Sequence, residues 1–316
     1  MNSATAKPKI VIFCGPTGIG KTSVAIELAQ RFNAQIIGAD SMQIYKYMDI
    51  GTAKPTAEER ARVIHHIVDV VAPDEPFDAA RYAEHARRII VKLCQQQILP
   101  FVVGGTGLYI KALLYGLFDD NVSDPQIRAK LKAEADMNGI DASYQRLRDL
   151  DPETANRLHP NDTYRILRAL EVVETTGKTI SRHHREHGFA EQPFDALKIG
   201  LQMERELLYE RIDQRVDAMF SAGFVDEVQS LLSRGYSADL KAMQSIGYRH
   251  VVDYLERRLT RAECVRTVKR DHRRYAKRQL TWFNADPDII WQAPNQIEGM
   301  IRLVDKFIGP DQESET

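Results

Sequence analysis

Three features of this 316-residue sequence predict an α/β fold, in which helices cover both faces of a parallel sheet and a further all-helical lobe is inserted. Short apolar runs alternate with segments of helical periodicity as far as Gly105. A glycine-rich turn, 15–20, joins the first apolar run to the first helical segment. From about residue 124 to residue 176 the periodicity is helical throughout, and no strong strand interrupts it.

The predicted strands are short runs rich in β-branched and aromatic residues. Continuous apolar runs of this length are typical of parallel strands that are buried on both faces. Because these runs alternate with helices, we expect one parallel sheet. The predicted strands are 9–14, 34–39, 67–71, 99–103, 197–201 and 288–291.

The helical segments divide the chain into a core and an inserted lobe. Residues 1–122 and 190–316 are expected to form the core, which ends in a long helical region, and residues 123–189 the lobe. The core helices are expected over 22–32, 56–63, 79–97 and, with breaks at Gly223, Gly235 and Gly247, over 204–283.

Composition and charge restrict the class of protein. Apolar residues make up 43% and charged residues 28%, a balance that can bury a sizeable core, and no apolar run approaches the roughly 18 residues of a membrane span. Cys14, Cys94 and Cys264 are scattered, and the amino terminus lacks the pattern of a secretory signal. We therefore expect a reducing cytoplasm, with neither a disulfide framework nor a zinc cluster. The net charge is −1, but residues 249–278 hold eleven Lys or Arg against four Asp or Glu, a local +7 that favours a nucleic-acid partner.

A phosphate-binding loop follows the first predicted strand. Its position between a strand and a helix predicts a P-loop NTPase-like core, because backbone N–H groups and the helix N-terminus then face one anion. Lys21 supplies positive charge for the terminal phosphate, and the Thr22 hydroxyl is a candidate ligand of Mg²⁺. Such loops usually hold triphosphates, so the pattern leaves ATP open and does not identify the reaction. The loop fits G-x-x-x-x-G-K-[ST] with Gly15, Pro16, Thr17, Gly18, Ile19, Gly20, Lys21 and Thr22.

Two further polar residues are expected at the same edge of the sheet. Nucleotide-hydrolysing P-loop enzymes normally carry an Asp at the end of a second apolar strand, whereas strand 99–103 is followed by Gly104-Gly105-Thr106. Asp40, at the end of strand 34–39, is then the first carboxylate to face the loop. Since ligands bind at the carboxyl ends of parallel strands, we expect Asp40 and Thr106 to converge on the P-loop.

Blocks of sequence spread over most of the chain carry a family resemblance. They are 15–22, 40–45, 48–55, 104–109, 161–165, 168–172, 211–217, 247–249 and 277–283. In this order and spacing they resemble the tRNA dimethylallyltransferase family as far as about residue 283, and because no zinc-finger Cys/His set follows, the bacterial form is the nearer match. One departure is Tyr164, where many members carry Gln before the Arg.

The resemblance implies transfer of a dimethylallyl group from dimethylallyl diphosphate to the N6 amine of adenosine 37 in tRNA, which gives N6-dimethylallyladenosine. Asp40 is then the general base that removes the N6 proton, and Thr106 hydrogen-bonds the same amine or the bridging oxygen. The P-loop, Arg215 and Mg²⁺ would hold the diphosphate leaving group. Without the resemblance, Arg215 is expected on a solvated helix face among charged neighbours.

The resemblance also implies a tRNA anticodon stem-loop as partner, with the target base extruded from its stack. We expect the basic segment to track phosphates, with aromatic residues for stacking, and arginines of the helical lobe to add positive charge. We also expect a monomer. The candidate tRNA-binding residues are Ser41, Met42, Gln43, Arg128, Arg165, Arg168, Gly247, Tyr248, Arg249, Lys277, Arg278 and Gln279.

Other functions share the phosphate loop. A P-loop small-molecule kinase would transfer phosphate from ATP and would not need the basic segment. Prenyl transfer to a free adenine nucleotide is disfavoured by that segment, because a mononucleotide does not require so large a basic surface. A pure RNA-binding module gives no reason for an intact phosphate loop.

Overall fold

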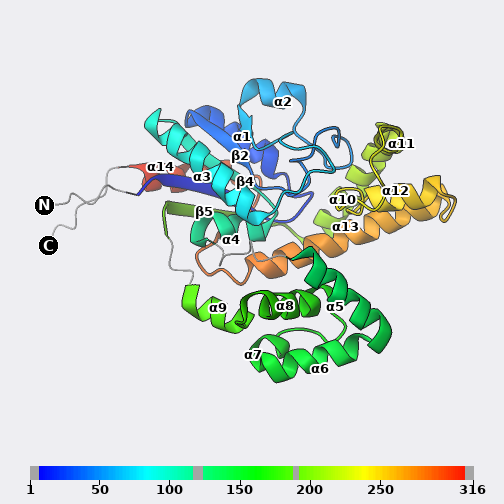
Figure 1. Cartoon of the computed structure of the whole chain (residues 1–316). Coiled ribbons are helices and arrows are strands. Elements are labelled where there is room, and N and C mark those ends of the chain that lie inside the picture. The colour runs from blue at the N-terminus through cyan, green and yellow to red at the C-terminus, as the bar shows by residue number, and fades with distance from the viewer. Residues whose placement is uncertain (1–6, 117–123, 188–191, 310–316) are drawn as a thin grey trace, which may run out of the picture. The chain divides into compact units, whose positions relative to one another are not determined.

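The computed structural model describes residues 7–116, 124–187 and 192–309. Within them, six parallel strands form one sheet in the order β3-β2-β4-β1-β5-β6 (Figure 1). The expected α/β class with a parallel sheet is confirmed. The strands are β1 (Lys9–Cys14), β2 (Ala34–Gly38), β3 (His65–His66), β4 (Leu99–Gly104), β5 (Asp195–Leu201) and β6 (Ile290–Gln292).

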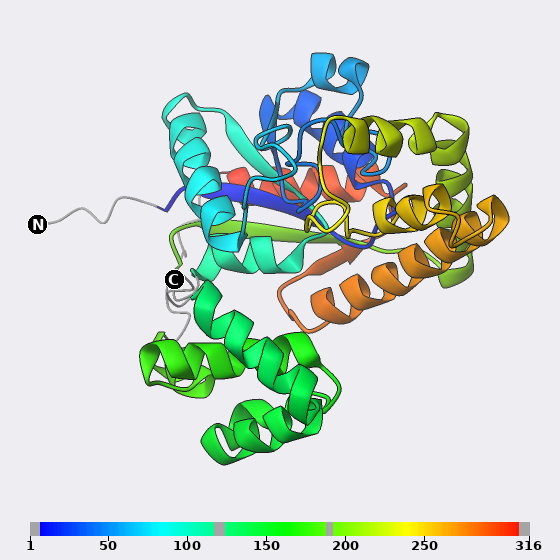
Figure 2. The same ribbon diagram turned by 45° about the vertical axis from the view of Figure 1, so that its right-hand side comes forward.

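The central strand β1 is apolar from Ile10 to Cys14 because helices cover both faces of the sheet. Val11 and Phe13 belong to a buried cluster that includes residues of α1 (Lys21–Arg31) and α14 (Ile297–Ile308). Ile10 and Ile12 alternate with them and are equally buried on the other face. There α3 packs against β4, so that α3 and α14 cover opposite faces (Figure 2).

The sheet belongs to a unit that comprises Met1–Leu114 and Pro193–Thr316 and contains several further helices. The helical region expected over 204–283 is present, and its breaks coincide with glycines: Gly223 and Gly247 are the N-caps of two helices. The sequence did not predict α14. No helix of the described residues is long and apolar enough to cross a membrane. The helices not yet named are α2 (Ala57–Arg62), α3 (Ala79–Gln95), α4 (Gly107–Tyr115), α10 (Arg205–Ser221), α11 (Phe224–Ser233), α12 (Tyr248–Leu255) and α13 (Arg261–Phe283).

A second compact unit, Tyr115–Gln192, is entirely helical in its described part. It has its own apolar core, in which Leu131, Leu147 and Ile166 are fully buried. The boundaries expected at 122/123 and 189/190 lie outside the described residues. The helices are α5 (Pro125–Asn138), α6 (Ile140–Leu150), α7 (Pro152–Ala155), α8 (Thr163–Thr176) and α9 (Ile180–His187).

Two predicted strands are displaced along the chain. The expected strand 67–71 is not formed, because Ile67 and Asp69 adopt positive φ angles of 58° that interrupt an extended backbone. The sheet is extended instead by His65–His66, and Val71 makes only an isolated bridge to Tyr45. The last strand begins later than expected, at Ile290.

Candidate active site

A small cavity of about 120 Å³ lies where β1, β2 and β4 reach their carboxyl ends. The P-loop, Asp40 and Arg215 all contribute to its wall, so residues from distant parts of the sequence meet there. Parallel sheets bind ligands at this edge. The lining residues are Thr17, Gly18, Gly20, Lys21, Thr22, Asp40, Gln43, Ala53, Val103, Gly104, Arg215, Tyr275 and Gln279.

The P-loop owes its conformation to its glycines. Gly20, the N-cap of α1, has φ 98°, a left-handed conformation that other residues rarely adopt. At Gly15, φ is 141° and a Cβ atom would stand 2.7 Å from the Leu201 carbonyl oxygen of β5. Pro16 and Ile19 complete the turn, and Ile19 is fully buried beneath it. The turn therefore leads β1 into α1 and leaves the first N–H groups of that helix to face an anion.

Lys21 is held inside this loop. Its Nζ donates hydrogen bonds to the carbonyl oxygens of Gly15 and Pro16, at 3.0 and 2.8 Å. Desolvation lowers the pKa of the ammonium group to about 8; the charge of Asp40 opposes this shift and that of Arg215 adds to it. A bound anion would favour the charged form.

Arg215 projects from α10 into the cavity. Its Nη1 lies 3.3 Å from the Thr17 hydroxyl and its Nη2 lies 3.5 Å from the Thr52 carbonyl oxygen. Its Nε is buried and has no hydrogen-bond partner in the described part of the chain. A buried guanidinium with an unused donor is suited to a multiply charged oxyanion. The local charge pattern alone predicted that Arg215 lies on a solvated helix face, and this prediction is wrong.

Asp40 follows β2 and is oriented by its own loop. Its Oδ1 accepts hydrogen bonds from the backbone N–H groups of Met42 and Gln43, at 2.8 and 3.3 Å. Its Oδ2 has no hydrogen bond within the described residues, and the carboxylate lines the cavity. One oxygen thus fixes the group, and the other is free to accept a proton.

Thr106 lies beside Asp40, as the convergence of strands predicts. Its Oγ1 accepts a hydrogen bond from the Ser41 N–H at 3.0 Å, and its own N–H donates to the Ala39 carbonyl oxygen at 3.1 Å. The two loops approach so closely that a Cβ atom on Gly104 would stand 2.1 Å from that same oxygen. Thr106 itself is not part of the cavity wall.

Gln279 was expected to contact tRNA, but its amide is already used within the site. Its Oε1 accepts the Thr17 N–H and its Nε2 donates to the Gly105 carbonyl oxygen, both at 2.8 Å. Gln279 as a whole is 6% exposed. Gln279 therefore joins the P-loop to the β4–α4 loop, and both ends of its amide are engaged inside the site.

Tyr275, one turn before Gln279 on α13, lines the cavity. From the sequence it was expected among the aromatic residues that stack on RNA, and not at the donor site. Burial and the nearby charge of Asp40 raise its pKa to about 12, and hydrogen bonding to Thr106 partly offsets the shift. The phenol is therefore a neutral donor or acceptor next to Asp40. Its i,i+4 relation to Gln279 was the available indication.

The other residues expected to bind tRNA on this unit divide into buried and exposed groups. Tyr248 is 1% exposed and donates to a Glu227 oxygen at 2.6 Å, so its ring is not available for stacking. Gly247 caps α12, and Arg249 pairs with Asp271 at 2.8 Å. Lys277 and Arg278 are exposed on α13.

In the helical unit, the three expected arginines are held by carboxylates. Arg128 and Arg168 both pair with Glu171, which is 1% exposed, at 2.9 and 3.0 Å. Arg165 is more exposed and pairs with Asp162 at 3.1 Å. The buried carboxylate of Glu171 therefore fixes the guanidinium groups of Arg128 and Arg168.

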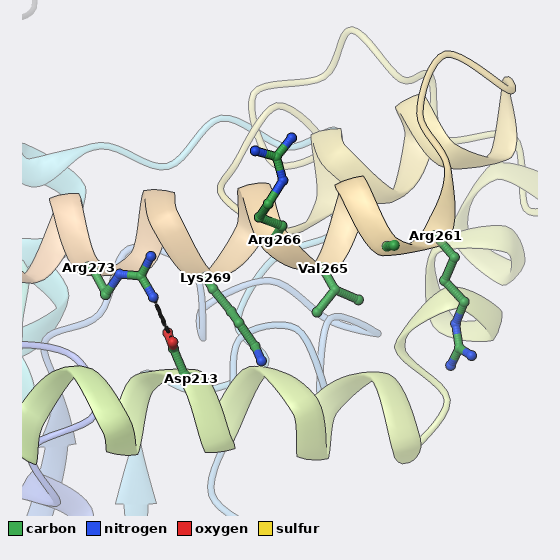
Figure 3. A pocket seen from close by; sticks show the side chains of 7 residues that line it. Asp213, Arg261, Val265, Arg266, Lys269 and Arg273 are labelled. Atoms are coloured by element: carbon green, nitrogen blue, oxygen red, sulfur yellow. Dashed lines mark hydrogen bonds and ion pairs between the residues drawn. The ribbon is translucent and has the colours of Figure 1, made fainter.

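A larger hollow, of about 710 Å³, lies between α10 and α13 and is not the candidate active site. Figure 3 shows Arg273 directed at Asp213 across this groove, and the two groups form an ion pair of 2.6 Å. Lys269 similarly pairs with Asp217 at 2.7 Å. Two of the four basic residues that line this groove are thus paired with carboxylates of α10, and no residue of the P-loop lines it.

A magnesium ion would find few protein ligands here. Within the described residues, no group of three or more His, Cys, Asp or Glu side chains is arranged so that it could hold a metal ion. Thr22, on the cavity wall, offers a hydroxyl. This donor set fits Mg²⁺, which commonly takes one or two protein ligands and completes its shell with phosphate oxygens and water.

Comparisons with known sequences cover almost the whole chain. The family model described as IPP transferase matches residues 43–286, and that described as isopentenyl transferase matches 8–69. The tRNA dimethylallyltransferase of Desulfosudis oleivorans is 55% identical, over 96% of this chain and 96% of that protein. The tRNA dimethylallyltransferase of Geobacter sulfurreducens is 48% identical, over 98% and 99%.

Solved structures agree. The tRNA isopentenylpyrophosphate transferase of Bacillus halodurans matches with a TM-score of 0.72 and 38% identity, over 95% of this chain and 97% of that one. A eukaryotic dimethylallyltransferase acting on tRNA matches with a TM-score of 0.77 and 28% identity, over 94% and 77%. Together with the cavity formed by the P-loop, Asp40 and Arg215, these matches show that the chain belongs to the IPP transferase family, in which its relatives are tRNA dimethylallyltransferases.

Proposed function

We propose that this protein transfers the dimethylallyl group of dimethylallyl diphosphate to N6 of adenosine 37 in tRNA. The observation that carries the proposal is that three groups line one cavity. They are the P-loop, the carboxylate of Asp40 with one oxygen free of hydrogen bonds within the described residues, and the guanidinium of Arg215 with its buried Nε. The first and third suit a diphosphate, and the second suits an acceptor that must lose a proton.

In the proposed reaction, the N6 lone pair forms a bond to C1 of the dimethylallyl group while the bond from C1 to the diphosphate oxygen breaks. The bonding electrons leave with the diphosphate. The P-loop N–H groups, Lys21 and Arg215 stabilise the charge that develops on it. In this proposal Oδ2 of Asp40 takes the N6 proton, and Thr106, whose Oγ1 accepts the Ser41 N–H, hydrogen-bonds the amine or the bridging oxygen.

Mg²⁺ is part of this proposal as a partner of the diphosphate. The Thr22 hydroxyl would hold it, and the ion would neutralise part of the diphosphate charge. The protein's own contribution is to fix the diphosphate by the P-loop backbone and by Lys21, whose Nζ must then turn from the Gly15 and Pro16 carbonyl oxygens to the ligand.

The acceptor in this proposal is the anticodon stem-loop of tRNA. Lys277 and Arg278 are exposed on the same helix that carries Tyr275 and Gln279 into the cavity. An RNA backbone bound by them would therefore be near the donor site. Ser41, Met42 and Gln43 immediately follow Asp40, and Gln43 lines the cavity, which favours contacts with the target base or its neighbours.

A single set of incubations tests the proposal against its alternatives. Labelled dimethylallyl diphosphate and Mg²⁺ are supplied with unmodified tRNA or with AMP, and γ-labelled ATP is supplied separately with small-molecule acceptors. We expect label in tRNA alone. Label in AMP alone, or phosphate transfer from ATP without prenyl transfer to tRNA, would overturn the proposal.

A further inference from the structure

A carboxylate outside the cavity holds a loop that contributes to the cavity. Glu227, on α11, accepts three consecutive backbone N–H groups: Asp49 and Ile50 donate to its Oε2 at 2.9 and 2.6 Å, and Gly51 donates to its Oε1 at 3.1 Å. The Tyr248 hydroxyl donates to Oε1 at 2.6 Å. One carboxylate thus receives four hydrogen bonds, three of them from consecutive N–H groups of the kind that binds anions.

Loop 49–53 also packs closely against α11 and α12, the helices that carry Glu227 and Tyr248. A Cβ atom on Gly51 would stand 2.2 Å from Phe224 and 2.6 Å from Tyr248. The two aromatic rings pack edge to face, with centroids 5.0 Å apart. The loop therefore has only glycine at its point of contact, and the packing determines its distance from α11 and α12.

The opposite side of the same loop touches the active site. The Thr52 carbonyl oxygen accepts from Arg215 Nη2 at 3.5 Å and from Gln43 Nε2 at 3.3 Å, and the Ala53 carbonyl oxygen accepts from Gln43 at 3.1 Å. Ala53 also lines the cavity. The last N–H group held by Glu227, that of Gly51, is one and two positions before the carbonyl groups of Thr52 and Ala53 that hold Arg215 and Gln43.

We infer that Glu227 is a positioning residue for the transfer reaction, acting through loop 49–53 on Arg215 and Gln43. Glu227 fixes the N–H groups of the loop. The carbonyl groups of Thr52 and Ala53 then align the Arg215 guanidinium with the diphosphate and the Gln43 amide with the adenine that accepts the dimethylallyl group. This inference rests on the proposed function, because its main readout is prenyl transfer to tRNA.

The test is Glu227→Gln. In either orientation of the new amide, an NH₂ group faces at least one backbone N–H, so the loop loses part of its attachment while the size of the side chain is kept. We expect kcat/KM for transfer to tRNA to fall about 10- to 100-fold, the range that hydrogen bonds to a charged group are worth. Affinity for inorganic pyrophosphate, measured by calorimetry, should fall too, and affinity for tRNA should not.

A matched control separates positioning from a general loss of stability. Glu59 also accepts a backbone N–H, that of Thr56 at 2.8 Å, in the capping box of α2, and is not part of the cavity wall. Glu59→Gln should lower the urea midpoint of unfolding without lowering kcat/KM. Tyr248→Phe, which keeps the ring and removes one donor to Glu227, should give a smaller loss of activity and no loss of tRNA affinity.

A double-mutant cycle with Arg215→Ala decides the route. If Glu227 acts through Arg215, Glu227→Gln should cost about threefold or less in the Arg215→Ala background, because the two losses are not additive. Fully additive losses, or unchanged pyrophosphate affinity in Glu227→Gln, would overturn the inference. A wild-type protein that does not prenylate tRNA would instead refute the proposed function, which keeps the two failures distinct.

Discussion

Gln279 gives a prediction whose magnitude follows from two hydrogen bonds. It accepts the Thr17 N–H and donates to the Gly105 carbonyl oxygen, and both partners are buried or at the cavity wall. Gln279→Leu removes both bonds with little change in size. The variant therefore tests whether this side chain supports the donor site or, as the sequence suggested, contacts RNA.

The expected loss of stability has two parts: a buried carbonyl group that loses its hydrogen-bond donor, and a backbone N–H group that water can reach instead. The Gly105 carbonyl is buried, and leaving it without a donor costs about 1–3 kcal/mol, while the lost bond to Thr17, whose N–H faces the cavity, costs about 1 kcal/mol. The free energy of unfolding should thus fall by about 2–4 kcal/mol. Affinity for pyrophosphate should fall as well, because the P-loop is no longer tied to the β4–α4 loop.

Gln279→Glu separates the hydrogen bond from the charge. The carboxylate still accepts the Thr17 N–H but places negative charge beside the cavity and an oxygen against the Gly105 carbonyl. We expect its pyrophosphate affinity to be lower than that of Gln279→Leu by at least about tenfold, a modest value for like charges in a partly buried site.

Urea unfolding and calorimetry with pyrophosphate measure both effects, and Gln244→Leu is the matched control. Gln244 also donates to a backbone carbonyl oxygen, that of Ala238 at 2.8 Å, but it is exposed and is not part of the cavity wall. Wild-type unfolding and pyrophosphate binding in Gln279→Leu, combined with weaker tRNA binding, would refute the reasoning and restore the RNA contact.

Four further predictions address the proposed base, the P-loop lysine and the RNA surface. Asp40→Ala should lower single-turnover transfer by about 10²- to 10⁴-fold with tRNA affinity intact, and full turnover would exclude Asp40 as the base. Because the pKa of Lys21 is lowered to about 8, the ratio of wild-type to Lys21→Gln affinity for pyrophosphate should be constant below that pH and fall as the pH rises through it. Pyrophosphate itself titrates equally in both measurements, so a ratio that does not change with pH would contradict the assignment. Without ligand, stability should rise between pH 8 and 10.5, because only the unfolded lysine still binds its proton there. Replacing Lys277 and Arg278 by Ala should reduce the salt slope of tRNA binding by about 0.7 per lost phosphate contact, whereas Lys306→Ala on α14 should not, and equal slopes would show that this part of α13 faces away from RNA.

The sequence predicted the residues whose position depends on the chain near them. The P-loop lies between a strand and a helix, and Asp40 and Thr106 follow neighbouring strands, so the parallel sheet alone brings them together. Gly104 and Gly15 are needed where one backbone crosses close to another, which a local pattern of glycines indicates without naming the partner.

What could not be predicted depends on contacts between distant segments. Gln279 is 262 residues from Thr17, and a basic helix gives no indication that one amide turns inward. Tyr248 directly precedes the charged segment 249–278, which favours RNA binding, but its hydroxyl donates to Glu227, on another helix. The strand expected over 67–71 failed for a local reason, the positive φ angles at Ile67 and Asp69, which β-branched composition does not reveal.

Asp40 connects the two halves of the proposed reaction through charge as well as proton transfer. Its negative charge favours the charged forms of both Lys21 and Arg215, whose pKa values desolvation lowers. When Asp40 takes the N6 proton it becomes neutral, and the departing diphosphate gains one negative charge as its bond to carbon breaks. The total charge facing the two cations is therefore the same before and after the step, and it moves toward the P-loop. A site that keeps its total charge constant needs little reorganisation of its surroundings, which is the condition under which fixed N–H groups and buried cations accelerate a reaction most.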